Sequence, residues 1–146
     1  MTIKFILLVN KQGQTRLSKY FDTKRVPAAG DARLLFEAEI VRKCLKRPDK
    51  DCNSVEHCGT RIIYRRYASL FFMIGVDGED NELAMLECIH CMVEAMDRWF
   101  GNVCELDIMF SLDMAYAIID EMVANGWVVD TQKSSIIAPL KLLENM

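Results

Sequence analysis

Residues 70–76, with the sequence LFFMIGV, are the feature that most restricts how this chain can fold. The segment is almost wholly apolar, which is typical of a strand buried on both faces rather than of a half-exposed strand with alternating polarity. A sheet that contains such a strand must be covered on both sides. We therefore expect residues 70–76 to form the central strand of a sheet that carries helices on its faces.

Two further pairs of segments predict hairpins. Residues 3–9 are rich in branched and aromatic side chains and end at a turn around Gly13, after which residues 15–21 continue as a second extended or helical element. Residues 54–57 and 60–66 flank the short connection Cys58-Gly59. Hairpin-length connections join neighbouring antiparallel strands, so the sheet is expected to be antiparallel.

Helical spacing of apolar residues marks the remaining elements. Residues 32–47 form an amphipathic helix that Pro48 ends, and a loop at 77–81 precedes a second, longer helix. A helix or helix pair from about 104 to 125 ends at Gly126. The faces expected to pack inward are Leu35, Ala38, Val41 and Leu45 in the first helix and Leu86, Ile89, Val93, Met96 and Phe100 in the second. The order of elements predicts one α+β domain over residues 1–146.

Composition narrows the class of protein. The chain has 51% hydrophobic residues and a net charge of -3, so it lacks the overall basic character of a nucleic-acid-binding domain. No apolar run approaches the roughly 20 residues that span a bilayer, and residues 3–9 are too short for a signal-peptide core. We expect a soluble protein of the cytosol.

Local positive charge gathers in two places despite the acidic total. One basic cluster lies within residues 42–47 and the other within residues 61–66. Each is either a solvated face or a binding surface.

Cys88 and Cys91 form a C-x-x-C motif, the strongest sign of metal or redox chemistry in the chain. A redox pair normally lies at a helix N-terminus, whereas these cysteines fall inside the second helix. A zinc site would need further ligands, which Cys52, His57 or Cys58 could supply. Ordinary helix packing is the favoured interpretation. With no glycine-rich phosphate loop, no serine elbow and two histidines in all, the chain is not expected to be an enzyme and needs no cofactor.

Several strings resemble a known family. They are IKFILLVNKQGQTRL at 3–17, YRRYASLFF at 64–72, DNEL at 80–83 and GNVCELD at 101–107. In this order they look like the small (sigma) chains of clathrin-type heterotetrameric adaptor complexes, and the resemblance covers essentially the whole chain. VNKQGQTRL, EIVRKCL and VEH are most similar to the sigma branch of adaptor protein complex 4.

The resemblance implies a longin-like (SNARE-like) fold, a five-stranded antiparallel sheet flanked by helices. It also implies obligate partners: two large chains, one of which packs against the small chain through its N-terminal helical solenoid, and a medium (mu) chain. Such complexes act in vesicle-mediated protein transport. The implied location is peripheral, on the cytoplasmic side of trans-Golgi network or endosomal membranes and coated vesicles, with membrane contact made through the partners.

In relatives the small chain and a large chain together bind acidic dileucine sorting signals in cargo tails. Arg16 would receive the acidic or phosphorylated residue upstream of the leucines. Carried over by position, the leucine pocket would be lined by Ala68, Leu70, Val93, Asn102, Val103 and Ile108. The same apolar residues also fit a core or a subunit interface. Residues 23–31 form a longer loop than in relatives, with no role to transfer.

Two alternatives remain at this point. A free-standing longin domain would regulate a small GTPase or membrane fusion without a solenoid partner. A small metal or redox protein would use Cys88 and Cys91.

Overall fold

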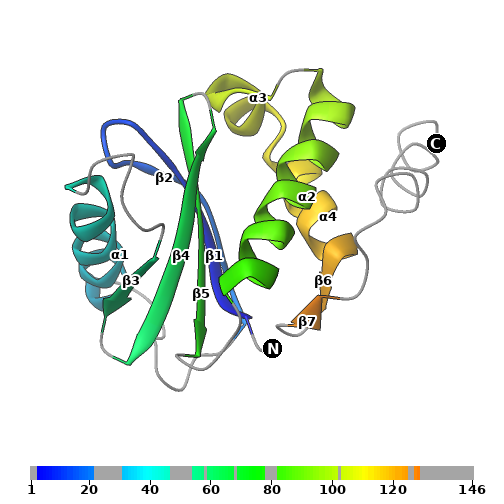
Figure 1. The fold of residues 1–146 in the computed structure, drawn as a ribbon. Coiled ribbons are helices and arrows are strands. Elements are labelled where there is room, and N and C mark those ends of the chain that lie inside the picture. Colours follow the sequence, from blue (N-terminus) through cyan, green and yellow to red (C-terminus); the bar gives the residue numbers. More distant parts are fainter. Residues whose placement is uncertain are drawn as a thin grey trace.

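The computed structural model describes residues 3–21, 31–46, 54–57, 59–67, 69–77, 82–101, 103–124 and 127–128. Within these ranges a five-stranded antiparallel sheet has α1 on one face and α2 and α4 on the other (Figure 1). The predicted fold class is therefore confirmed.

The sheet has the strand order β2-β1-β5-β4-β3, so the apolar segment is central, as predicted. A further two-stranded sheet pairs β6 with β7. The strands are β1 (Ile3–Asn10), β2 (Thr15–Tyr20), β3 (Ser54–His57), β4 (Thr60–Tyr67), β5 (Leu70–Asp77), β6 (Val123–Ala124) and β7 (Trp127–Val128).

The helices are α1 (Asp31–Leu45), α2 (Glu82–Phe100), α3 (Glu105–Phe110) and α4 (Leu112–Met122). The segment predicted as a helix or helix pair is thus a pair. In the described part of the chain, none of the helices has the length and apolar character needed to cross a bilayer. Of the loops predicted at 23–31 and 77–81, Asp31 begins α1 and Asp77 ends β5, while residues 23–30 and 78–81 lie outside the described residues. The helix-ending roles of Pro48 and Gly126 also lie outside them.

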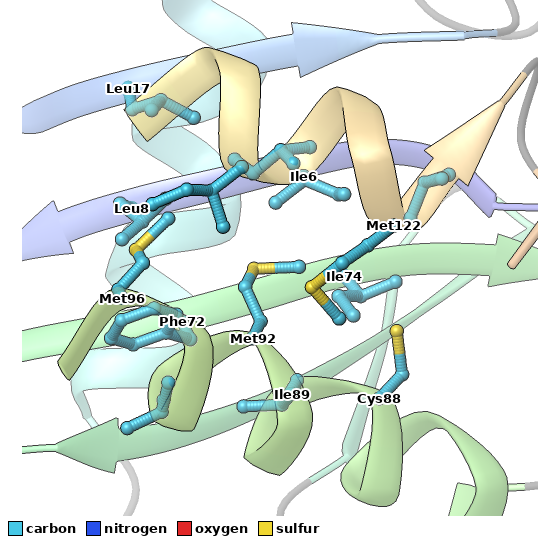
Figure 2. Packing of buried hydrophobic residues seen from close by; sticks show 14 of the residues in the cluster. Ile6, Leu8, Leu17, Phe72, Ile74, Cys88, Ile89, Met92, Met96 and Met122 are labelled. Atoms are coloured by element: carbon cyan, nitrogen blue, oxygen red, sulfur yellow. The ribbon is translucent and has the colours of Figure 1, made fainter. Parts of the chain in front are cut away.

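Alternation along the central strands divides the core into two layers. On β5, Phe72 and Ile74 face α2 and α4, whereas Phe71 and Met73 face α1. Figure 2 shows side chains of β1 and β5 meeting those of α2 and α4 in the larger layer. Every residue of β1 is buried, including the polar residues at its ends. Both central strands thus depend on cover from both sides.

The predicted inner face of α1 is largely wrong. Leu35 is 62% exposed and Ala38 is also exposed, Leu45 is half-buried, and Val41 alone of the four is buried. The α1 side chains that pack on the sheet are Phe36, Ile40, Val41 and Cys44.

The sequence from 34 to 36 explains this error, because Leu34, Leu35 and Phe36 are consecutive and each can begin an apolar face. Phe36 packs edge-on against Phe5 of β1, with ring centroids 5.7 Å apart. An aromatic ring buries more area than a leucine side chain, so the helix turns Phe36 to the sheet. In α2, by contrast, Ile89, Val93 and Met96 are buried as predicted, with Leu86 and Phe100 half-buried at the edge of the same layer.

Gly75 generates the first prediction. It pairs with Phe5 across β5 and β1, and a Cβ at this position would overlap the Phe5 ring. That ring is held between Tyr20 and Phe36, each 5.7 Å away between centroids. We expect Gly75→Ala to lower the free energy of unfolding by about 1–3 kcal/mol through overpacking, measured by denaturant unfolding.

The matched control is the double variant Gly75→Ala/Phe5→Leu. Because the smaller leucine side chain would make room for the new methyl group, the two substitutions should be less destabilising together than the sum of their separate effects. Strict additivity would contradict the proposed overlap.

Candidate functional site

A polar network fixes Arg16 at the edge of the sheet. Nε of Arg16, on β2, donates to Oε1 of Glu105 over 2.7 Å, and Nδ2 of Asn10 donates to the same oxygen over 2.9 Å. Oε1 of Gln14 accepts hydrogen bonds from the same two side chains, from Nη2 of Arg16 over 2.8 Å and from Nδ2 of Asn10 over 2.9 Å. Because Glu105 begins α3, the network ties the first hairpin to that helix.

These bonds set the charge state of Glu105. Hydrogen bonds from Asn10 and from Arg16 hold the pKa of the Glu105 carboxyl below its usual range. The Arg16 and Glu105 side chains are 28% and 24% exposed, so solvent still reaches the pair. The family resemblance implied that Arg16 receives the upstream acid of a cargo signal. In the structure, the Glu105 carboxylate of the chain itself lies beside Arg16.

Four of the predicted pocket residues come together in the structure. Leu70, Val93, Val103 and Ile108 belong to one packed layer and are 0%, 7%, 3% and 0% exposed. They come from β5, α2 and the segment around α3, and the fold places all four in this layer. Ala68 and Asn102, the other two, lie outside the described residues.

An open cavity of about 350 Å³ lies beside this layer, between the end of β4 and α2. Of the predicted residues that the structure describes, Val93 lines it, while Leu70, Val103 and Ile108 are buried elsewhere in the layer. Its lining residues are Arg65, Arg66, Tyr67, Ile89, His90, Val93, Glu94 and Asp97. The apolar part of the lining is Val93, which is 7% exposed, and Ile89, which is fully buried; the other lining residues are polar or charged.

Asp97 links the walls of this cavity. Its Oδ2 accepts a 2.5 Å hydrogen bond from the Tyr67 hydroxyl, and its Oδ1 accepts one of 2.7 Å from the Val103 backbone N–H. The bond to Asp97 raises the pKa of Tyr67. One carboxylate therefore connects the end of β4, α2 and the segment that leads to α3.

Tyr67, His90 and Asp97 were missed as site residues from the sequence. Helical spacing could have indicated His90 and Asp97, because each lies three or four residues from Val93 on α2. Nothing in the sequence indicates that Tyr67 reaches Asp97, since that contact depends on how α2 crosses the sheet.

The charges around the cavity are of both signs. Arg65 and Arg66 come from β4, and Glu94 and Asp97 come from α2, where Glu94 also contacts His90. Such a site can receive an apolar side chain next to Val93 while its rim makes polar contacts with the peptide that carries it.

The structure buries Cys88, the first thiol of the C-x-x-C motif. Cys88 is 3% exposed, and burial raises its pKa to about 12, the opposite of what a redox thiolate requires. His57 packs with Phe36 on the α1 side of the sheet, whereas Cys88 belongs to the α2 side, so His57 cannot join Cys88 in a metal site. Among the described residues no metal-binding group of three side chains occurs; Cys52 and Cys58 lie outside them.

The Glu105 network predicts a specific pH dependence. Because the pKa of Glu105 is lowered on folding, the ionised carboxylate stabilises the fold above its unfolded pKa of about 4.3. This contribution is lost as the pH falls through the lower, folded pKa. We expect Glu105→Gln to unfold at a lower temperature than the unmodified chain at neutral pH, with the difference shrinking in acid.

Thermal unfolding between neutral and acidic pH measures this effect. Glu121→Gln, which neutralises an exposed carboxylate on α4, is the control. A difference between Glu105→Gln and the unmodified chain that does not change with pH would contradict the role assigned to the charge.

The chain is similar in sequence to known sigma subunits of adaptor complexes. The AP-4 complex subunit sigma of Arabidopsis thaliana is 56% identical over 144 residues, covering 99% of this chain and 98% of the relative. The human AP-4 complex subunit sigma-1 is 47% identical over 144 residues, covering 99% and 97%. Both alignments run nearly end to end.

A structural relative agrees with the sequence comparisons. A chain in a homology model of the full-length AP-3 complex in a stretched open conformation matches with a TM-score of 0.75 and 27% identity, covering 98% of this chain and 94% of that one. The family model for the clathrin adaptor complex small chain matches residues 2–146. These proteins are non-enzymatic subunits, in line with the prediction from sequence. The chain belongs to the clathrin adaptor complex small-chain family.

Proposed function

We propose that this chain, as one domain over residues 1–146, is the sigma subunit of an AP-4-type adaptor complex. In this role it stabilises the complex and contributes to binding acidic dileucine signals in cargo tails. Its partners are two large chains and a medium chain, and these hold it on the cytoplasmic side of trans-Golgi network or endosomal membranes. The high identity to sigma subunits named for AP-4 supports the subtype.

Exposed apolar side chains on α3 support an obligate partner. Leu106, Met109 and Phe110 are 59%, 47% and 83% exposed, and Leu112 continues the surface at the start of α4. A cluster of this kind on a small chain is typical of a surface that another subunit covers. Permanent interfaces bury on the order of 2,000 Å² or more and are more apolar than the rest of the surface.

The cavity beside Val93 is the observation that carries the cargo-binding role. Its apolar lining is Val93, which is 7% exposed, and the fully buried Ile89, at a position where α2 passes the end of β4. Its volume of about 350 Å³ lies at the lower end of the usual range for ligand sites. A short peptide motif with two leucines matches both its size and its chemistry.

Arg16 fits the upstream acidic residue of such a signal. Its bonds to Glu105 and Gln14 use two of the five donors of a guanidinium group, which leaves capacity for a second carboxylate. Glu105 begins α3, the helix that contains Ile108, so the network holds Arg16 next to the layer behind the cavity.

The expected affinity is weak. Burying two leucine side chains contributes roughly 3 to 6 kcal/mol, and a charge-assisted hydrogen bond adds about 1.5 to 3 kcal/mol. Binding also orders a flexible tail, and the conformational freedom that the tail loses offsets several kcal/mol of this gain. The dissociation constant should therefore be about micromolar. Many weak contacts at one membrane then combine by avidity.

The subunit role predicts the composition of the assembly. Affinity purification of the tagged chain from its own cells should recover two large chains and one medium chain in equal amounts, measured by quantitative mass spectrometry. Phe110→Ser should reduce this recovery, because it removes exposed apolar area without touching the core. Phe110→Leu, which keeps an apolar side chain, is the control. Recovery with a small GTPase and no large chain would refute the role.

The cargo role predicts a distinct effect at Val93. In the purified complex, Val93→Thr should weaken binding of a fluorescent acidic dileucine peptide about fivefold, because a hydroxyl replaces a methyl group that contacts leucine. Fluorescence anisotropy measures the change.

Val41→Thr is the matched control, since Val41 is equally buried but lies on the α1 side of the sheet. It should leave peptide affinity unchanged. Arg16→Gln should weaken a peptide with the upstream acid more than one with alanine there. Equal effects of Val93→Thr and Val41→Thr would contradict the proposed site.

A further inference from the structure

A second cavity lies on the other side of the sheet, between α1 and β3. It has a volume of about 290 Å³. Figure 1 shows α1 beside the edge strand β3, with α1 on the face of the sheet away from α2. Its lining residues are Glu39, Arg42, Lys43, Lys46 and His57. None of these residues belongs to the cargo site or the subunit surface proposed above.

Three cations line this cavity at the C-terminal end of α1. Lys46, just after the helix, follows Arg42 by four residues and Lys43 by three, so it lies near both, and all three are exposed. Lys43 also donates from Nζ to the backbone oxygen of Glu56 over 3.4 Å, which draws it toward β3. A chain with a net charge of -3 thus concentrates positive charge at one point.

His57 is the second observation, and it is independent of the surface charge. Its side chain is 7% exposed and packs against the Phe36 ring, with centroids 5.6 Å apart. Nε2 lies 3.2 Å from Oε2 of Glu39, yet among the described residues neither ring nitrogen has a hydrogen-bond partner of acceptable geometry. A short distance without alignment contributes little to the strength of a hydrogen bond.

A buried imidazole must carry a proton on at least one nitrogen, so His57 presents a donor that lacks an acceptor. Leaving such a group unsatisfied is costly, and native proteins seldom do so without a functional reason. Because His57 lines the cavity, an acceptor atom placed there would complete its bonding.

We propose that the cavity between α1 and β3 binds a small phosphate-bearing anion. Arg42, Lys43 and Lys46 surround the mouth and supply positive charge, and His57 donates to a phosphate oxygen from below. A phosphate group offers several acceptor oxygens, which match the fork of an arginine and the point charges of lysines. The phosphate belongs either to a lipid headgroup or to a free small molecule.

The helix-dipole role of two of the cations and the negative charge of Glu39 both bear on whether the cavity binds an anion. Arg42 and Lys43 lie in the last turn of α1, where cations also stabilise the helix dipole, but that role leaves the unsatisfied His57 unexplained. Glu39 places one carboxylate in the cavity and opposes an anion. With three cations against one carboxylate, the local charge remains positive, and the Glu39 charge provides a test of opposite sign.

The test uses the full-length chain, tagged and purified in whatever assembly it forms, with pyrophosphate as the probe in isothermal titration calorimetry. Arg42→Gln/Lys46→Gln should weaken binding at least about tenfold, since two charge-assisted contacts are lost. Lys11→Gln/Arg98→Gln removes the same charge from exposed positions outside the cavity and should have little effect. Equal losses in both variants would overturn the site.

Two single variants separate a built site from a charged surface. His57→Phe keeps a ring against Phe36 but removes the donor, so it should weaken binding while leaving the thermal midpoint unchanged or higher. Glu39→Gln should strengthen binding. Unchanged affinity in both variants would show that a diffuse basic surface, rather than this cavity, attracts the anion. Succinate binding as tightly as pyrophosphate would likewise overturn phosphate recognition in favour of acidic peptides.

Vesicle flotation distinguishes the two sources of phosphate. Phosphatidylcholine vesicles with phosphatidic acid display a phosphate monoester, and those with phosphatidylserine display comparable charge without one. Flotation with phosphatidic acid vesicles that pyrophosphate reverses and that Arg42→Gln/Lys46→Gln abolishes would assign the site to a lipid headgroup. Pyrophosphate binding without flotation would assign it to a free phosphate compound, and absence of both would refute the proposal.

Discussion

Burial of β5 on both faces is the constraint on which the rest of this structure depends. Neither β5 nor its neighbour β1 can face water, so one layer of helix must cover each side of the sheet. The requirement divides the chain into two surfaces with separate chemistry. The α2 side contains the cavity beside Val93, and the α1 side contains the cavity beside His57.

Polar contacts then set the positions of the elements that the apolar core leaves adjustable. Asp97 joins the end of β4 to the segment before α3, and Glu105 joins α3 to the first hairpin. Both carboxylates lie next to the packed layer that contains Val103 and Ile108. The cavity at this place therefore has a packed floor, while its rim depends on a few charge-assisted bonds that solvent can reach.

The two surfaces suit different kinds of partner. The cavity at α2 combines apolar side chains with charges of both signs, which favours a peptide with apolar anchors. The cavity at α1 is small and mainly basic, with a buried donor, which favours a compact anion. The exposed apolar side chains of α3 form a third surface, suited to another subunit. Because the sheet separates the two cavities, both can be occupied at the same time.

The sequence by itself determined the class of fold, the central strand and both hairpins, because strand burial and turn chemistry are local properties of the chain. The leucine pocket of Leu70, Val93, Val103 and Ile108 came from the family resemblance and stays a prediction; the structure places all four in one packed layer. Prediction from the sequence failed for α1, where three consecutive apolar residues allow several inward faces and only the sheet surface selects Phe36. The tertiary structure alone decided that Val93 reaches a cavity while Leu70 is buried, that Tyr67 meets Asp97, and that His57 lies beneath three cations. Such contacts join residues far apart in the chain, so their geometry follows from how helices pack on the sheet rather than from any spacing in the sequence.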